Sequence, residues 1–278
     1  MVRFCLFVLT LTGLSVARAA TAQTASNNSS KDSTATDFGA GYEIIMHRQE
    51  YDHDPPPPFG TGEGPIQMIQ IYPLIIAPLT PDGKAFNAEV SEMAENWWYD
   101  SIRGQIAPAI LNTDITLDCE PIGRPPPVDD GSQNRKMLPG IISAACESYL
   151  YPHGAAHGDG TYWGFNWIVK ERRIVTPRDV FDVHSKWLET LSKAANAERA
   201  PDVPPSFPLQ KLDFANTRHW VLTANGLGLI YSTREFSGFV EGGVGVLAVI
   251  PWSKLAPYLN PHGIVPQSDW NATLPTGN

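Results

Sequence analysis

Apolar and polar residues along the chain follow a pattern that predicts many strands and two helices. Apolar segments of strand length, separated by Gly, Pro, Asn and Asp, are typical of β-structure. They lie at 42–50, 66–79, 113–120, 140–150 and 161–173, with further runs on either side of Asn225-Gly226. In the segment 161–173 the alternation places Trp163, Phe165 and Trp167 on one face.

Two other segments have the spacing of helices. The first apolar stripe consists of Phe86, Val90, Met93 and Trp97, and continues as far as Ile110. The second consists of Trp187, Leu188, Leu191 and Ala195. A helix start precedes the second, with Thr176 as N-cap, Pro177 in the first turn and Asp179 near the positive helix end. We therefore expect an α+β fold: a largely antiparallel sheet packed by two main helices, in a single domain.

Two short motifs refine this picture. Asn225-Gly226 predicts a tight hairpin, because both residues tolerate a positive φ. The adjacent Trp97 and Trp98 could form a platform on which a sugar stacks, although packing in the core is the simpler use of these side chains.

The first residues have the features of a secretory signal peptide. Arg3 precedes an apolar run, which ends at the small-residue pattern Ala17-Arg18-Ala19. We expect a signal peptide at 1–19, a disordered tether at 20–40, one domain at 41–262 and a C-terminal tail at 263–278. No later stretch has the roughly 18 apolar residues that a membrane helix needs. The expected mature protein is periplasmic or secreted, with no membrane span.

The charge excludes one class of partner and favours another. The whole chain carries a formal charge of −9, and loss of Arg3 and Arg18 with the signal peptide leaves 18 basic and 29 acidic residues, or −11. Binding to nucleic acid requires a basic face, so we expect no nucleic-acid partner. A cationic partner would be attracted, although solubility alone would also explain the charge.

Two cysteines remain after export, Cys119 and Cys146. Each shares an alternation with apolar neighbours, so both thiols are expected on the apolar faces of their strands. An even pair in an oxidising compartment predicts a disulfide; two buried free thiols are the alternative.

The stretch "YLYPHGAAHGDGTYWGF" at 149–165 contains the main candidate site. His153 and His157 are four residues apart, but Gly154 and Gly158 make a helical metal motif implausible. We expect a sharply bent connection between strands, shaped by the two glycines. In the alternative, His153, His157 and Asp159 bind a metal ion, which would need a further ligand that the sequence does not identify.

Other catalytic signatures are missing from the sequence. There is no Gly-x-Ser-x-Gly nucleophile motif, no cysteine left over as a nucleophile, and no phosphate-binding glycine loop before a helix. We therefore expect a non-catalytic protein without a cofactor. The rival hypothesis is a metal-dependent cell-wall hydrolase that uses the HGAAHGD loop.

Four motifs in the C-terminal half resemble one extracytoplasmic domain of unknown function, over roughly 149–259. They are a Tyr-x-x-Gly-Ala-Ala-His-Gly loop (Tyr151, Gly154, Ala155, Ala156, His157, Gly158), a helix-start segment (Thr176, Asp179, Val180, Phe181), a hairpin (Asn225, Gly226, Leu227) and an ending (Gly245, Val249, Ile250, Pro251, Trp252, Leu255). That domain forms the outer part of RsiV-type anti-sigma factors and precedes the catalytic domain of PdaC-type peptidoglycan deacetylases. The chain shows no sigma-binding segment and no deacetylase domain, so we expect neither of these two activities.

The resemblance implies a binding module of the bacterial envelope. In the anti-sigma factors the known ligand is lysozyme, and in the deacetylases the setting is peptidoglycan. We therefore expect an envelope protein or a peptidoglycan-related ligand as partner. From the residues of the loop we expect ligand contacts at Tyr151, His153, His157, Asp159 and Tyr162.

Overall fold

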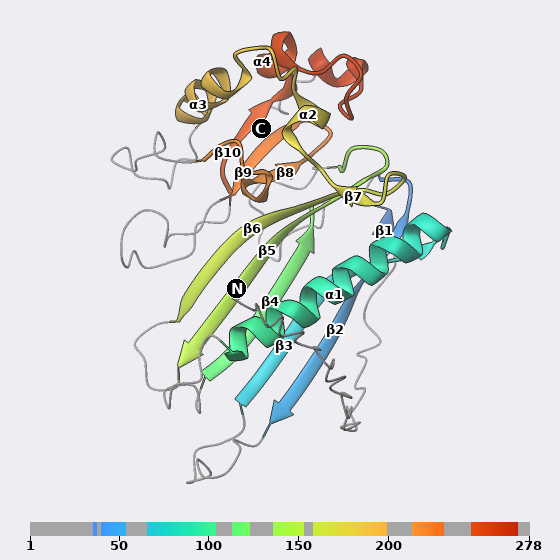
Figure 1. The fold of residues 1–278 in the computed structure, drawn as a ribbon, viewed down its shortest axis with the longest axis vertical. Coiled ribbons are helices and arrows are strands. Elements are labelled where there is room, and N and C mark those ends of the chain that lie inside the picture. The colour runs from blue at the N-terminus through green and yellow to red at the C-terminus, as the bar shows by residue number, and fades with distance from the viewer. Residues whose placement is uncertain are drawn as a thin grey trace, which may run out of the picture.

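The computed structural model describes residues 36–37, 40–53, 66–103, 113–122, 136–152, 158–198, 213–230 and 246–271. These residues form an α+β domain, as expected, but with two sheets rather than the one predicted. The sheets lie at opposite ends of the long axis of the domain (Figure 1). The larger sheet has seven strands in the order β1-β2-β3-β4-β5-β6-β7, and the smaller has three in the order β10-β9-β8.

Most elements are close to the predicted ranges, but a turn at 169–172 interrupts the strand that was predicted at 161–173. The larger sheet contains β1 (Thr36–Asp37), β2 (Glu43–His53), β3 (Ile66–Ala77), β4 (Thr113–Pro121), β5 (Ile141–Pro152), β6 (Asp159–Ile168) and β7 (Arg173–Ile174). The smaller sheet contains β8 (Trp220–Leu222), β9 (Gly226–Ile230) and β10 (Val246–Pro251). The helices are α1 (Pro81–Arg103), α2 (Pro177–Val180), α3 (Trp187–Ala197) and α4 (Trp252–Leu255), with short 3₁₀ turns η3 (Thr217–His219), η5 (Ala256–Tyr258) and η6 (Gln267–Asn271).

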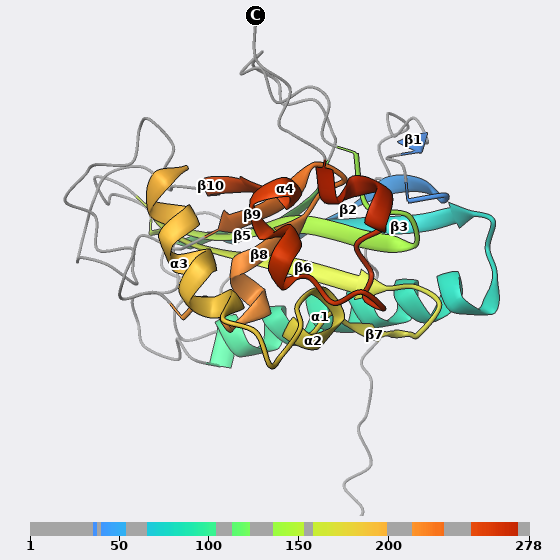
Figure 2. The same cartoon turned by 90° about the horizontal axis from the view of Figure 1, so that it is seen from above.

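Strand pairing is antiparallel except between β3 and β4, which are parallel. A parallel pair needs a crossover connection, and α1 lies in the chain between these two strands. Helix α1 covers one side of the larger sheet (Figure 2). Phe86 and Val90 of the predicted stripe are fully buried against that side, together with Trp163, Phe165 and Trp167 of β6. The alternation predicted for β6 is therefore confirmed.

Helix α3 packs against the core of the smaller sheet. The prediction of its buried face is wrong for one residue. Trp187, Leu191 and Ala195 are buried in this core, whereas Leu188 is 42% exposed. The buried residues form one row at a spacing of four. Leu188 lies about 100° around the helix from Trp187, beyond the edge of this narrow stripe.

A buried polar junction joins the two sheets. The side chain of Asn166 donates to the carbonyl of Trp220 at 2.7 Å and accepts from the hydroxyl of Ser143 at 2.7 Å. The backbone N–H of Leu222 donates to the same Ser143 hydroxyl at 2.8 Å. Strand β8 therefore meets β5 and β6 on the side of the sheet opposite α1, and the polar groups satisfy one another.

The predicted hairpin is present between β8 and β9, but its turn differs from the one expected. Among the described residues only Gly41, Gly140 and Arg172 have a positive φ, so neither Asn225 nor Gly226 uses the left-handed region. The hydroxyl of Thr223 accepts from the N–H groups of both residues and closes the turn. A Cβ at Gly226 would lie 2.3 Å from the carbonyl oxygen of Ile250, so this glycine permits close packing.

The packed core extends beyond both expected ends of the domain. On the N-terminal side β1 pairs with β2, and Ala40 is buried, although we expected a tether here. On the C-terminal side Val265 is buried and Trp270 packs against the same core as α3, although we expected a loose tail. Too few residues are apolar at either end to give a periodic signal.

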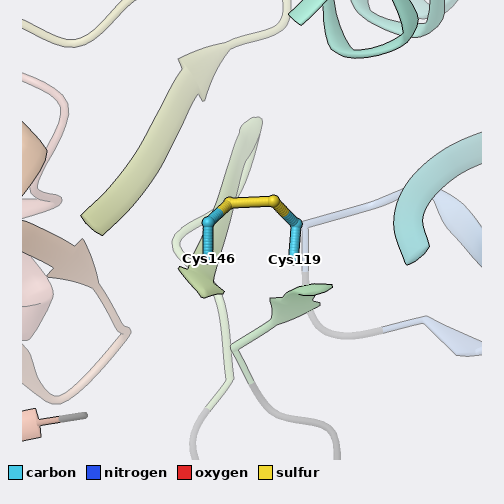
Figure 3. The surroundings of a disulfide bond; sticks show 2 residues. All are labelled: Cys119 and Cys146. Carbon is cyan, nitrogen blue, oxygen red and sulfur yellow. A yellow bond between two sulfur atoms is a disulfide. The ribbon is translucent and has the colours of Figure 1, made fainter. Parts of the chain in front are cut away.

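The predicted disulfide is present. Cys119 of β4 and Cys146 of β5 occupy directly opposite positions and are bonded through their sulfur atoms (Figure 3). Both residues are buried beneath α1, in agreement with their predicted apolar face. Among the described residues, no helix combines the length and the apolar character needed to cross a membrane.

Candidate functional site

The predicted loop connects two neighbouring antiparallel strands, β5 and β6, whose last described pair is Leu150 with Asp159. His153, Gly154 and His157 lie outside the described residues, as does the side chain of Asp159. The proposed metal ligands therefore remain predictions. Within the described part of the chain, no three His, Cys, Asp or Glu side chains gather as a metal site.

Gly158 stands at the end of this loop, where space is restricted. A Cβ here would lie 2.3 Å from the ring of Tyr149 and 2.7 Å from the carbonyl oxygen of Leu150. The N–H of Gly158 also donates to the Tyr149 hydroxyl at 3.2 Å. The ring of Tyr149 thus lies against Gly158, and only glycine leaves room for it. Tyr149 did not enter our predicted site.

Tyr162 is held in place by Glu147 of the neighbouring strand. Its hydroxyl donates to a carboxylate oxygen of Glu147 at 2.5 Å. Burial, followed by this hydrogen bond, raises the pKa of Tyr162 above its ordinary value. Tyr162 therefore remains a neutral donor throughout the physiological pH range and cannot act as a general base there.

The register places Tyr149, Tyr151 and Tyr162 on the side of the sheet opposite α1, since side chains of directly opposite residues share a face. Four acidic residues of β4 and β5 occupy the same side. We call this set of seven residues the tyrosine face: Asp114, Asp118, Glu120, Glu147, Tyr149, Tyr151 and Tyr162.

The tyrosine face is strongly acidic. It contains four carboxylates and no basic residue, while Arg48 lies two strands away on the same side and is bonded to Glu50. Tyr149 is 37% exposed, and Tyr151 and Tyr162 are half-buried. Such a surface offers amphipathic rings and negative charge, which together suit a cationic protein surface.

A groove of about 840 Å³ lies on the opposite side of the sheet, between α1, β6 and η3. Trp163 and Phe165 form its floor, Glu89 and Glu92 stand on the α1 wall, and Arg218 stands on the other wall. The Arg218 guanidinium lies 5.7 Å from the centre of the Trp163 ring, a cation–π contact. The groove can hold a mixed polar and apolar group. No local sequence pattern predicts this groove, because Arg218 and Glu89 are far apart in the chain.

Trp97 lines the same groove and also packs against the core, which is the simpler of the two uses that we considered for it. The side chain of Trp98 lies outside the described residues, so the paired platform stays a prediction.

A comparison with models of protein families gives no match. A comparison with curated proteins gives none either. The solved structures that share the fold include two of DUF3298 family proteins. The one from Bacteroides fragilis has a TM-score of 0.54 and 12% identity, and the match covers 84% of this chain and 98% of that one. The one from Pseudomonas aeruginosa has a TM-score of 0.52 and 16% identity, and covers 81% of this chain and 98% of that one.

These similarities show the fold of a domain of unknown function. At such identities they do not transfer a ligand or a catalytic residue to this chain. The link to RsiV-type and PdaC-type proteins therefore stays an expectation from the sequence motifs.

Proposed function

We propose that the protein is an exported, non-catalytic binding module of the bacterial envelope, and that its tyrosine face binds a cationic protein such as lysozyme. The observation that carries the proposal is the composition of this face, with three tyrosines among four carboxylates. Tyrosine gives a large contact area at a low cost in side-chain entropy, and therefore recurs at binding surfaces. The carboxylates supply long-range attraction and orientation.

Two features support an exported location. The signal-peptide pattern stands at the N-terminus, and Cys119 and Cys146 are bonded. Disulfides persist in oxidising compartments and are rare in the cytosol. A periplasmic or secreted setting would also place the protein where it meets lysozyme and peptidoglycan.

Calorimetric titration of the mature protein with lysozyme at low salt tests this proposal. Binding should weaken about tenfold or more in Tyr149→Ala, because this ring is the most exposed tyrosine of the face and truncation of a central anchor costs over 1 kcal/mol. In Glu147→Gln the acceptor for Tyr162 is retained and only the charge is lost, so about a two- to fivefold weakening is expected.

Glu95→Gln is the matched control, because Glu95 is an exposed carboxylate on α1, on the other side of the sheet. It should bind like the unmodified protein. An absence of heat with the unmodified protein, or an equal loss in Glu95→Gln and Glu147→Gln, would remove the tyrosine face as the binding surface.

The rival function is a metal-dependent hydrolase of cell-wall material, with His153, His157 and Asp159 as ligands. Elemental analysis of the purified protein distinguishes the two. Stoichiometric zinc that is lost in His157→Ala would favour the hydrolase, since removal of one ligand from a zinc site lowers its affinity severely. The binding-module proposal expects the same low metal content in both proteins.

A further inference from the structure

Within the described part of the chain, the outer edge of β2 is unpaired over most of its length. On its inner side β2 pairs with β3 from Glu43 to His53. On its outer side β1 pairs only with Glu43 and Ile44. Among the described strands, none pairs with 45–53 on this side, and Figure 1 shows β2 at the border of the sheet. Unpaired N–H and C=O groups along such an edge are a template for another strand.

The opposite edge of the same sheet, at β6, is closed in a different way. Strand β7 pairs with Trp167 and Ile168. The segment around η3 crosses this edge, because Arg218 stacks on Trp163 on one side while the Trp220 carbonyl accepts from Asn166 on the other. The described protein therefore covers part of β6, and β2 is the better candidate for pairing between chains.

The charges on β2 indicate which strand would pair with it. Arg48 and Glu50 point to the same side of the sheet, with side chains 39% and 40% exposed. In an antiparallel pair of two β2 strands centred on Gln49, Arg48 of each copy lies opposite Glu50 of the other. Opposite charges directly across a pair of strands stabilise it, and like charges destabilise it.

Neighbouring registers are less complementary in charge. A pair centred on Arg48 places the two Arg48 side chains together. One centred on Glu50 places Arg48 opposite Asp52 of the other copy, but it also brings the two Glu50 carboxylates together. In the register centred on Gln49 the two amides meet, and each amide can both donate and accept a hydrogen bond. Of these three registers, the one centred on Gln49 is thus the one that pairs opposite charges without a contact between like charges.

We propose that two copies of this chain pair through β2, antiparallel and centred on Gln49, as a two-fold symmetric dimer. The symmetry axis then runs perpendicular to the sheet, as an isologous contact requires. Two seven-stranded sheets join into one, with both α1 helices on one side and both tyrosine faces on the other. This inference does not depend on the function proposed above.

Charge reversal on β2 tests the contact. Analytical ultracentrifugation measures the dissociation constant of the dimer, at moderate salt so that repulsion between the two negatively charged copies is screened. Arg48→Glu places like charges together at two symmetric points and should weaken the dimer about tenfold or more. The double variant Arg48→Glu/Glu50→Arg restores the opposite charges and should return to within about threefold of the original affinity. Lys193→Glu, on exposed α3, is the control and should change nothing.

A cysteine tests the register. Directly opposite residues of an antiparallel pair have Cα atoms about 4.5–5.5 Å apart, within the range of a disulfide. Gln49→Cys should therefore give a covalent dimer on mild oxidation, much faster than Lys193→Cys. Three results would each overturn the proposal. They are a monomer at all concentrations tested, a dimer whose dissociation constant is unchanged by Arg48→Glu, and equal cross-linking of the two cysteine variants.

Discussion

Gly164 is the residue on which the contact between the two sheets most depends. It lies in β6 where β8 crosses, and a Cβ at this position would lie 1.7 Å from the carbonyl oxygen of Trp220. That carbonyl also accepts a hydrogen bond from Asn166. Because the obstacle is backbone rather than the end of a side chain, it cannot move without disturbing the polar junction.

We expect Gly164→Ala to lower the free energy of unfolding by about 1–3 kcal/mol or more, as overpacking of a core does. Gly160→Ala is the matched control in the same strand, since a Cβ there would meet its nearest atoms at an ordinary 3.4 Å. It should be neutral or stabilise slightly, because alanine restricts the unfolded chain. Urea denaturation of the two variants measures the difference, and equal stability would show that β8 does not rest on Gly164.

Asp179 links the start of α2 to β7. Its carboxylate accepts from the guanidinium of Arg173 at 2.7 Å and from the N–H and hydroxyl of Thr176, each at 2.7 Å. Burial alone would raise the pKa of Asp179, but the hydrogen bonds from Arg173 and Thr176 outweigh it and lower the pKa to about 2. The predicted helix start at Thr176, Pro177 and Asp179 is confirmed.

This lowered pKa predicts a loss of stability in acid. The folded-state pKa of Asp179 lies below its ordinary value of 3.8, so the contribution is complete above about pH 4 and disappears as the pH falls towards 2. We expect about 1–2 kcal/mol, since Arg173 is 39% exposed and its interaction is partly screened. Asp179→Asn should lose this amount in urea denaturation at pH 6, and the gap from the unmodified protein should close near pH 2. A gap of constant size would contradict the assignment.

Among the elements, the pair β4 and β5 is fastened by the disulfide between Cys119 and Cys146, which are 27 residues apart in sequence. A cross-link of this span restricts the unfolded chain and typically stabilises a protein by about 2–4 kcal/mol. The double variant Cys119→Ser/Cys146→Ser should lose about that amount in denaturant unfolding. Addition of a reducing agent should lower the stability of the unmodified protein alone, and an equal response of both proteins would exclude this role.

The elements with a strong period were predictable from sequence, and the contacts between them were not. Trp163, Phe165 and Trp167 alternate without interruption, so their shared face could be read directly. The same alternation places Asn166 on the other side of the sheet. From the sequence alone, its side chain could equally have faced solvent there. Its role depends on Ser143 and Trp220, which are distant in sequence. The division into two sheets follows from such contacts and had no local signal.

For the candidate site, local sequence identified the loop but not the surface beside it. Tyr151 and Tyr162 lie on the same face because β5 and β6 pair in one register. Asp114 reaches this face through the pairing of β4 with β5. The separation of these residues in the sequence does not indicate their distance in space. The acidic residues of the tyrosine face can therefore be recognised only from the pairing of the strands.

For the molecule as a whole, the proposed export sets the charge of the mature protein. Cleavage after Ala19 should give a chain that begins at Ala20 and has a formal charge of −11. Intact mass and N-terminal sequencing of the protein, expressed with its own leader and recovered from outside the cytoplasm, measure both points. A full-length chain retained in the cytoplasm would exclude the proposed location.

We propose that a cationic partner binds to the tyrosine face rather than to the α1 side of the sheet. Hydrogen exchange of the mature protein, with and without lysozyme at low salt, tests it most directly. We expect slower exchange in β4 and β5, around Asp114–Glu120 and Glu147–Tyr151, with no change in α1. Protection confined to α1 and its groove, or no protection anywhere, would contradict it.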